Sequence, residues 1–80
     1  MENIMLIKTC NRRENVDAVQ KSLTDFGCII KTRLGLHQAG DACSNEGLII
    51  LHLTEDSEEI AKLEMALNKI ECVSCKTVQI

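Results

Sequence analysis

The sequence predicts an α+β domain with the element order βαββαβ, built as a four-stranded antiparallel sheet with two helices on one face. The first observation behind this prediction is an internal repeat at an offset of 44 residues, in which Ile4 and Leu6 correspond to Leu48 and Ile50. The second is that each half runs through a short apolar segment, a helix-capping pattern and apolar residues at helical spacing. Two βαβ units in tandem give the ferredoxin-like arrangement. Right-handed crossovers put both helices on one face, with the first and third strands central.

The first half supplies a strand, a helix and a second strand. Residues 3–9 are a short apolar run of the length expected for a strand. Asn11, with Glu14 three residues later, matches an N-capping pattern. The helix that follows has apolar residues on one face: Val16, Val19, Leu23 and Phe26. Gly27 is placed to end this helix in a left-handed conformation, and residues 28–37 are the second predicted strand.

The second half repeats these elements after a polar connection over residues 38–46. The third strand is expected from Gly47 to residue 53 or 54, and Asp56 with Glu59 repeats the capping pattern. The second helix again has one apolar face: Ile60, Leu63, Leu67 and Ile70. Residues 72–80 form the fourth strand, whose apolar residues change phase midway, so it bends or is covered on both faces. Residues 1–80 therefore form a single domain.

The two central strands are apolar on both faces, although one helical layer covers only one. Alternation assigns one set to the helices: Met5, Ile7, Ile49, Leu51 and Leu53. The other set faces away from them: Ile4, Leu6, Leu48, Ile50 and His52, with Lys8 at the rim. Aliphatic side chains in the middle of an open face make a patch of a few hundred Å², typical of an interface. We predict a homodimer or higher oligomer formed through this face. The alternative is a β-bulge that mixes the two faces.

Composition narrows the range of functions. The chain has one Phe, no Trp and no Tyr, which disfavours a base-stacking nucleic-acid module. A net charge of −3 and scattered basic residues predict no direct binding of nucleic acid. No apolar segment is long enough to span a membrane, and no signal peptide is recognisable. Five cysteines inside apolar segments indicate reduced thiols in a cytoplasmic protein rather than a secreted disulfide framework.

Catalytic motifs are absent, so we predict that the chain is not an enzyme. Cys72 and Cys75 have the spacing of a zinc knuckle or redox pair. However, they fall on a predicted strand, where residues three apart point to opposite faces. Buried cysteine behaves as a small hydrophobe, and this interpretation is preferred for Cys28, Cys72 and Cys75.

A metal site remains an alternative in the connection between the second and third strands. His37 and Cys43 offer an imidazole and a thiolate, ligands that suit Zn, Ni or Cu. Two ligands per chain need a symmetry mate, or Asp41 and Glu46, to complete the coordination. The simpler interpretation is a polar loop that carries one cysteine.

A small-molecule site is predicted from two segments. At the first strand-to-helix turn, Asn11 and Arg12 lie where free N–H groups favour an anion. On the second strand, Arg33, Gly35 and His37 could also contribute, because glycine lets a ligand approach the backbone. The competing interpretation of Gly35 is a strand bulge.

Three short motifs resemble one family. They are Arg33-Leu-Gly-Leu, Gly47-Leu-Ile-Ile-Leu and Lys76-Thr-Val, within a similarity that extends from Met5 to Val78. The family consists of small ACT-like proteins described as regulators of an iron-only hydrogenase system, related to the regulatory domain of the nickel-responsive repressor. Arg33 and Gly35 match its Arg-x-Gly core. His37 stands where Pro is commoner, and the loop with Cys43 is longer than usual.

The resemblance implies a cytoplasmic, ACT-like regulatory or sensor module that assembles through its sheets and is without established catalysis. Together with the apolar face, it leads to a first hypothesis of a small effector bound at the subunit boundary. The second hypothesis is a metal-binding sensor or metal-handling protein that uses His37 and Cys43. A purely structural partner subunit is the third. The ligand would thus be a small effector or a divalent metal.

Overall fold

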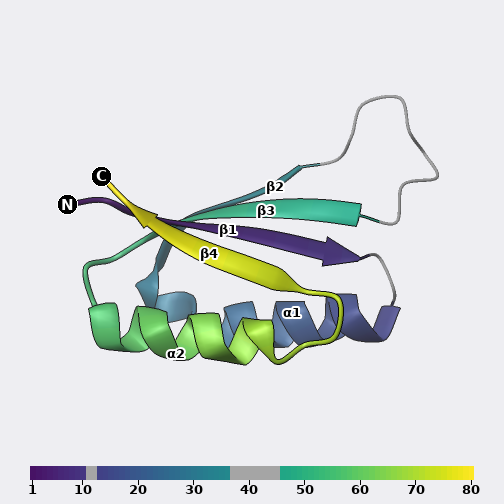
Figure 1. The fold of residues 1–80 in the computed structure, drawn as a ribbon. Coiled ribbons are helices and arrows are strands. Elements are labelled where there is room, and N and C mark those ends of the chain that lie inside the picture. Colours follow the sequence, from purple (N-terminus) through teal and green to yellow (C-terminus); the bar gives the residue numbers. More distant parts are fainter. Residues whose placement is uncertain (11–12, 37–45) are drawn as a thin grey trace.

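A computed structural model of the chain describes residues 1–10, 13–36 and 46–80. A four-stranded sheet lies on a layer of two helices (Figure 1). The elements, in chain order, are β1 (Asn3–Cys10), α1 (Arg13–Asp25), β2 (Ile30–Leu36), β3 (Glu46–Leu53), α2 (Ser57–Asn68) and β4 (Ser74–Gln79). The strand order is β2-β3-β1-β4, and every neighbouring pair is antiparallel. The predicted fold and the central position of β1 and β3 are confirmed.

The hydrophobic core lies between the helices and one face of the sheet. Met5 and Ile7 of β1 and Leu51 of β3 are fully buried there, as the strand alternation predicts. The remaining core residues come from both helices, from the end of β3 and from the turns before β2 and β4: Val19, Leu23, Ile29, Leu53, Ile60, Leu63, Leu67 and Val73. The three-four-three spacing therefore identified the buried helical faces correctly.

The start of α2 follows the predicted capping pattern. The Asp56 carboxylate accepts a hydrogen bond of 3.2 Å from the backbone N–H of Glu59, which satisfies a donor that the helix leaves free. The corresponding cap proposed at Asn11 lies outside the described residues. Glu59 also accepts a hydrogen bond from Lys62 at 3.2 Å, one turn further along the same exposed face.

The end of α1 differs from the prediction. Gly27 does not take a left-handed conformation; instead the chain passes into a short 3₁₀ turn, Gly27–Ile29, before β2 begins. This turn between α1 and β2 places the side chain of Ile29 in the core. At the end of α2 the left-handed residue is Cys72, with φ of 60°. Both outer strands accordingly start two residues later than predicted, at Ile30 and Ser74.

A β-bulge does occur, but in β2 rather than in β4. The register between β2 and β3 shifts between Ile30 and Thr32, which makes Lys31 the extra residue. The pairing of β4 with β1 is continuous from Ser74 to Gln79. Apolar residues of β4 therefore occupy both faces of the sheet without a break in the strand.

Within the described residues, no helix is long and apolar enough to cross a lipid bilayer.

We predict that Leu63→Ala lowers the free energy of unfolding by about 2–5 kcal/mol, because it opens a cavity at a fully buried position. The matched control is Met65→Ala on the same helix, where the side chain is 62% exposed, and it should cost less than about 1 kcal/mol. Urea unfolding followed by circular dichroism measures both. Equal losses in the two variants would contradict the assignment of the core.

Candidate functional site

The sheet face opposite the helices carries a contiguous aliphatic surface. One row across the strands shows it: Leu34 of β2 pairs with Ile50 of β3, which pairs with Leu6 of β1. In the next row, Leu36 pairs with Leu48. We call this surface the open face. Its aliphatic members are Ile4, Leu6, Leu34, Leu36, Leu48, Ile50 and Val78.

Much of this surface is accessible to solvent in the single chain. Leu34 is 52% exposed, and Leu6 and Leu48 are 37% and 39% exposed. The open face includes all five residues that the sequence assigned to an interface, since Ile4 and His52 lie in the same cross-strand row. Their placement on one uncovered face is as predicted. Association through that face stays a prediction.

The sequence missed Leu34 and Leu36 because of the bulge in β2. Simple alternation from the core-facing Ile30 puts both leucines on the helical side. The extra residue at Lys31 reverses the phase, so Leu34 and Leu36 join the open face while Arg33 turns towards the helices. The pairing of Arg33 with the buried Leu51 confirms this direction. In the sequence, the one sign that Leu34 and Leu36 share a face was their spacing of two residues.

A charged pair stands at one end of the open face. His52 Nε2 lies 2.8 Å from a carboxylate oxygen of Glu2. The hydrogen bond from His52, its charge and the more distant charge of Lys31 lower the pKa of the Glu2 carboxyl below its ordinary value. Lys8 and Lys76 lie on the same face, beside Leu48 and Leu6 respectively, towards the opposite end.

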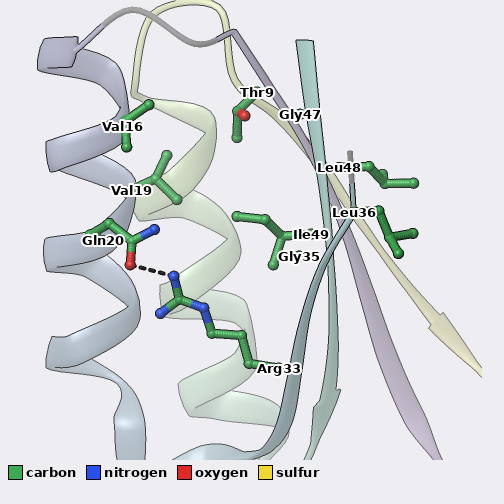
Figure 2. A pocket seen from close by; sticks show the side chains of 10 residues that line it. All are labelled: Thr9, Val16, Val19, Gln20, Arg33, Gly35, Leu36, Gly47, Leu48 and Ile49. Carbon is green, nitrogen blue, oxygen red and sulfur yellow. Dashed lines mark hydrogen bonds between the residues drawn. The ribbon is translucent and has the colours of Figure 1, made fainter. Parts of the chain in front are cut away.

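On the helical side, a cleft opens between α1 and the ends of β2 and β3. Its volume is about 210 Å³, and Figure 2 shows the residues that line it: Thr9, Val16, Val19, Gln20, Arg33, Gly35, Leu36, Gly47, Leu48 and Ile49. Val16 and Val19 approach from α1, and Ile49 faces them from β3. Leu36 and Leu48 contribute from the strand ends while their side chains point to the open face.

Arg33 supplies the positive charge of this cleft. Its guanidinium reaches from β2 to α1 and donates a hydrogen bond to the side-chain oxygen of Gln20 (Figure 2). Among the residues that the structure describes, Arg33 forms no ion pair, so its charge is not neutralised by a carboxylate. A guanidinium held by a neutral amide beside aliphatic walls suits the carboxylate of a small apolar-bodied ligand.

The predicted ligand-binding residues divide into two groups. Arg33 and Gly35 both line the cleft, as part of one wall. Gly35 is not a bulge, because it pairs regularly with Ile49. Its missing Cβ would meet nothing within 4 Å, which is consistent with open space in front of it. Three other predicted ligand-binding residues lie outside the described part of the chain: Asn11, Arg12 and His37.

The metal hypothesis is untested for the same reason. Residues 1–10, 13–36 and 46–80 contain no group of three His, Cys, Asp or Glu side chains that could hold a metal ion. His52, within that part, is engaged with Glu2. The proposed ligands His37 and Cys43 fall between the described ranges.

The cysteines depart most from the sequence-based prediction. Cys10, at the end of β1, forms a disulfide with Cys72, 62 residues later, and their Cα atoms are 5.9 Å apart. The expectation that every thiol is reduced is therefore wrong for this pair. Cys28 is exposed rather than a buried hydrophobe, because it sits in the 3₁₀ turn. Cys75 is half-buried and packs against the core.

Burial raises the pKa of the Cys75 thiol to about 11, with a further contribution from the charge of Glu64. Its sulfur also lies 3.6 Å from the backbone oxygen of Glu64. A thiol in this environment stays protonated near neutral pH and is a poor nucleophile. Cys72 precedes β4 and is bonded to Cys10 instead of Cys75, so the strand alternation used for this pair in the sequence does not apply to it.

Comparison with solved structures places the chain among ACT-like folds. An uncharacterized protein of Thermotoga maritima aligns with a TM-score of 0.86 and 28% identity, over 96% of this chain and 92% of that one. The ACT domain from the GTP pyrophosphokinase of Chlorobium tepidum aligns with a TM-score of 0.75 and 12% identity, over 98% and 97%. The regulatory subunit of aspartate kinase from Thermus flavus gives 0.58 and 17%, over 95% and 49%. No family model and no curated protein matches the chain.

We predict that His52→Gln raises the pKa of Glu2 towards its ordinary value, because the largest cause of the lowered pKa is the contact with His52. Since a lowered carboxyl pKa stabilises the fold above the unfolded-state pKa, this contribution is lost as pH falls through the folded-state pKa. NMR titration of the Glu2 carboxyl carbon measures the shift. An unchanged Glu2 titration in the variant would contradict this cause.

Proposed function

We propose that this ACT-like domain is a small regulatory module that binds an anionic effector in the cleft and assembles through its open face. One observation carries the proposal: the ends of β2 and β3 belong to both surfaces. Arg33, Gly35 and Ile49 face the cleft, while the alternating Leu36 and Leu48 reach the open face. An effector and a second copy of the chain would therefore contact opposite sides of the same two strand segments.

The chemistry of the cleft defines the class of effector. Arg33 offers a charged donor for a carboxylate, and the aliphatic side chains of Val16, Val19 and Ile49 offer an apolar wall. A cleft of about 210 Å³ is smaller than the roughly 300–1,000 Å³ typical of drug-sized ligands. We infer a metabolite of amino-acid size, with its carboxylate at Arg33.

The open face supports assembly of two copies. Its aliphatic members form a contiguous patch with charged residues at the edges, the usual composition of an interface core and its rim. Glu2 and His52 lie at one end, and Lys8 and Lys76 towards the other. A two-fold axis in the interface, perpendicular to the strands, would bring Glu2 of one copy towards Lys8 and Lys76 of the other.

Binding and assembly would be coupled through the shared strand ends. An effector that binds one subunit arrangement more tightly than another shifts the population towards that arrangement. Typical coupling free energies are about 1–3 kcal/mol, which correspond to a roughly 5–150-fold change in apparent affinity. The dimerisation constant measured with and without effector would therefore report the regulatory event directly.

The resemblance carried by Arg33-Leu-Gly-Leu and Lys76-Thr-Val supports one cellular setting, regulation of an iron-only hydrogenase system. An inspection of the neighbouring genes tests this setting. Adjacent genes for hydrogenase maturation would support it, and their consistent absence from the genomes that carry this protein would contradict it. The effector and assembly proposals do not depend on this outcome.

We predict that Arg33→Gln weakens binding of an amino-acid effector roughly tenfold, the lower end of what a hydrogen bond to a charged group contributes, because Arg33 is partly solvated. A panel of L-amino acids at millimolar concentration, screened by thermal shift, identifies the probe, and calorimetry gives its Kd. The matched control is Lys31→Gln, which removes a positive charge from the same strand outside the cleft. An equal loss of effector affinity in both variants would mean that Arg33 acts only through the net charge of the domain and not by direct contact. No thermal shift with any amino acid would refute the effector class.

We predict that Leu48→Lys converts the dimer to a monomer. Burying an unpaired charge in an interface costs several kcal/mol, so the dimer Kd should rise at least about 100-fold. Sedimentation equilibrium over a range of concentrations measures it. Met65→Lys, on the exposed side of α2, introduces the same charge away from the open face and should leave the dimer intact. A wild-type chain that stays monomeric at high concentration would refute assembly.

A further inference from the structure

The surroundings of the disulfide between Cys10 and Cys72 favour thiol–disulfide exchange. It joins the end of β1 to the turn between α2 and β4, two segments that meet at the same end of the sheet (Figure 1). Cys72 is exposed, whereas Cys10 is half-buried. An incoming thiol therefore reaches the sulfur of Cys72 more easily than that of Cys10.

Asn15 links this pair to the first turn of α1. The side chain is buried, and its Nδ2 lies 3.1 Å from the sulfur of Cys10 and 3.2 Å from that of Cys72. An amide N–H at this position donates to a thiolate on either cysteine, and hydrogen bonds to the charged form lower a thiol pKa. The sulfurs also lie near the N-terminal end of α1, where the helix dipole favours negative charge.

The backbone at Cys72 adds a second feature. Its φ of 60° is in the left-handed region, which is unfavourable for a residue with a side chain and persists only where the surroundings enforce it. The disulfide to Cys10 is one such restraint. The bond to Cys10 therefore sits on a residue whose backbone conformation depends on its surroundings.

A hollow of about 610 Å³ lies beside the two cysteines and is lined by both of them. Lys8 and Lys69 both line it, and so does the acidic Glu71. This volume falls in the range of small-molecule sites. The ammonium group of Lys69 near a disulfide suits a thiol that itself carries a carboxylate.

From these observations we propose that Cys10 and Cys72 form a reversible dithiol–disulfide couple, and that the hollow beside them binds a low-molecular-weight thiol bearing carboxylates. Asn15 is the positioning residue that stabilises the departing thiolate. The proposal is independent of the effector cleft, since the two sites share only the strand end at Thr9.

The reaction with a monothiol is balanced in two exchanges. A thiolate of the small molecule attacks the sulfur of Cys72, which forms a mixed disulfide, breaks the Cys10–Cys72 bond and releases Cys10 as a thiolate beside Asn15. A second thiolate attacks the mixed disulfide, releases Cys72 as a thiolate and leaves as the oxidised, disulfide-linked small molecule. The two protein thiolates then take the two protons of the consumed thiols. Two electrons pass from the small thiols to the protein disulfide.

The test uses the native full-length chain in buffers of graded reduced-to-oxidised glutathione ratio. After acid quenching and alkylation, peptide mapping by mass spectrometry follows Cys10 and Cys72 separately from Cys28. We expect Cys10 and Cys72 to titrate together and reversibly in the folded protein. In Cys10→Ser, glutathione should accumulate on Cys72 as a mixed disulfide. A bond that opens only in denaturant, or thiols that stay free at every ratio, would overturn the couple.

Two variants test the surroundings of the sulfurs. Asn15→Ala should slow the first exchange about threefold to tenfold, because the leaving thiolate loses a hydrogen bond. Asp17→Ala, an exposed change on the same helix, should leave the rate unchanged. Lys69→Gln should slow reaction with glutathione while leaving reaction with uncharged 2-mercaptoethanol unaffected. If the two thiols respond equally to Lys69→Gln, the carboxylate site is refuted.

Discussion

Strands β1 and β3 carry aliphatic side chains on both faces, and the two helices cover only one. Met5 and Ile7 are completely buried under the helical layer, while their neighbours Ile4 and Leu6 face the other way. A strand buried on a single face normally alternates apolar and polar residues. The departure from that alternation in the two central strands leaves the open face, on which the proposed assembly depends.

The bulge in β2 determines which residues of this strand face the cleft and which face away from the helices. Because Lys31 is an extra residue, the alternation of side chains between the two faces changes phase between Ile30 and Thr32. Arg33 then points towards α1 and meets Gln20, and the adjacent leucines extend the open face to the sheet edge. One inserted residue thus supplies both the charged group of the cleft and part of the apolar surface. This is why the two surfaces share the same strand ends.

On the β4 side of the sheet, away from the bulged strand β2, lies the disulfide between Cys10 and Cys72. The end of β1 and the turn after α2 converge, which places Cys10 and Cys72 together under the side chain of Asn15. The half-buried Cys75, with its raised pKa, stays outside this chemistry although it is only three residues away. Burial and hydrogen bonding, rather than spacing along the chain, separate the reactive pair from the inert thiol.

The sequence by itself determined the element order, the sheet topology and the buried faces of both helices. These features follow from the spacing of apolar residues and from the internal repeat, both of which can be seen along the chain. It also determined which face of β1 and β3 is left open, and it singled out Arg33 and Gly35. Only the tertiary structure decided the direction in which Arg33 points, since a bulge is a property of the pairing between two strands. The Cys10–Cys72 bond was likewise beyond the sequence, because it depends on the meeting in space of two turns 62 residues apart.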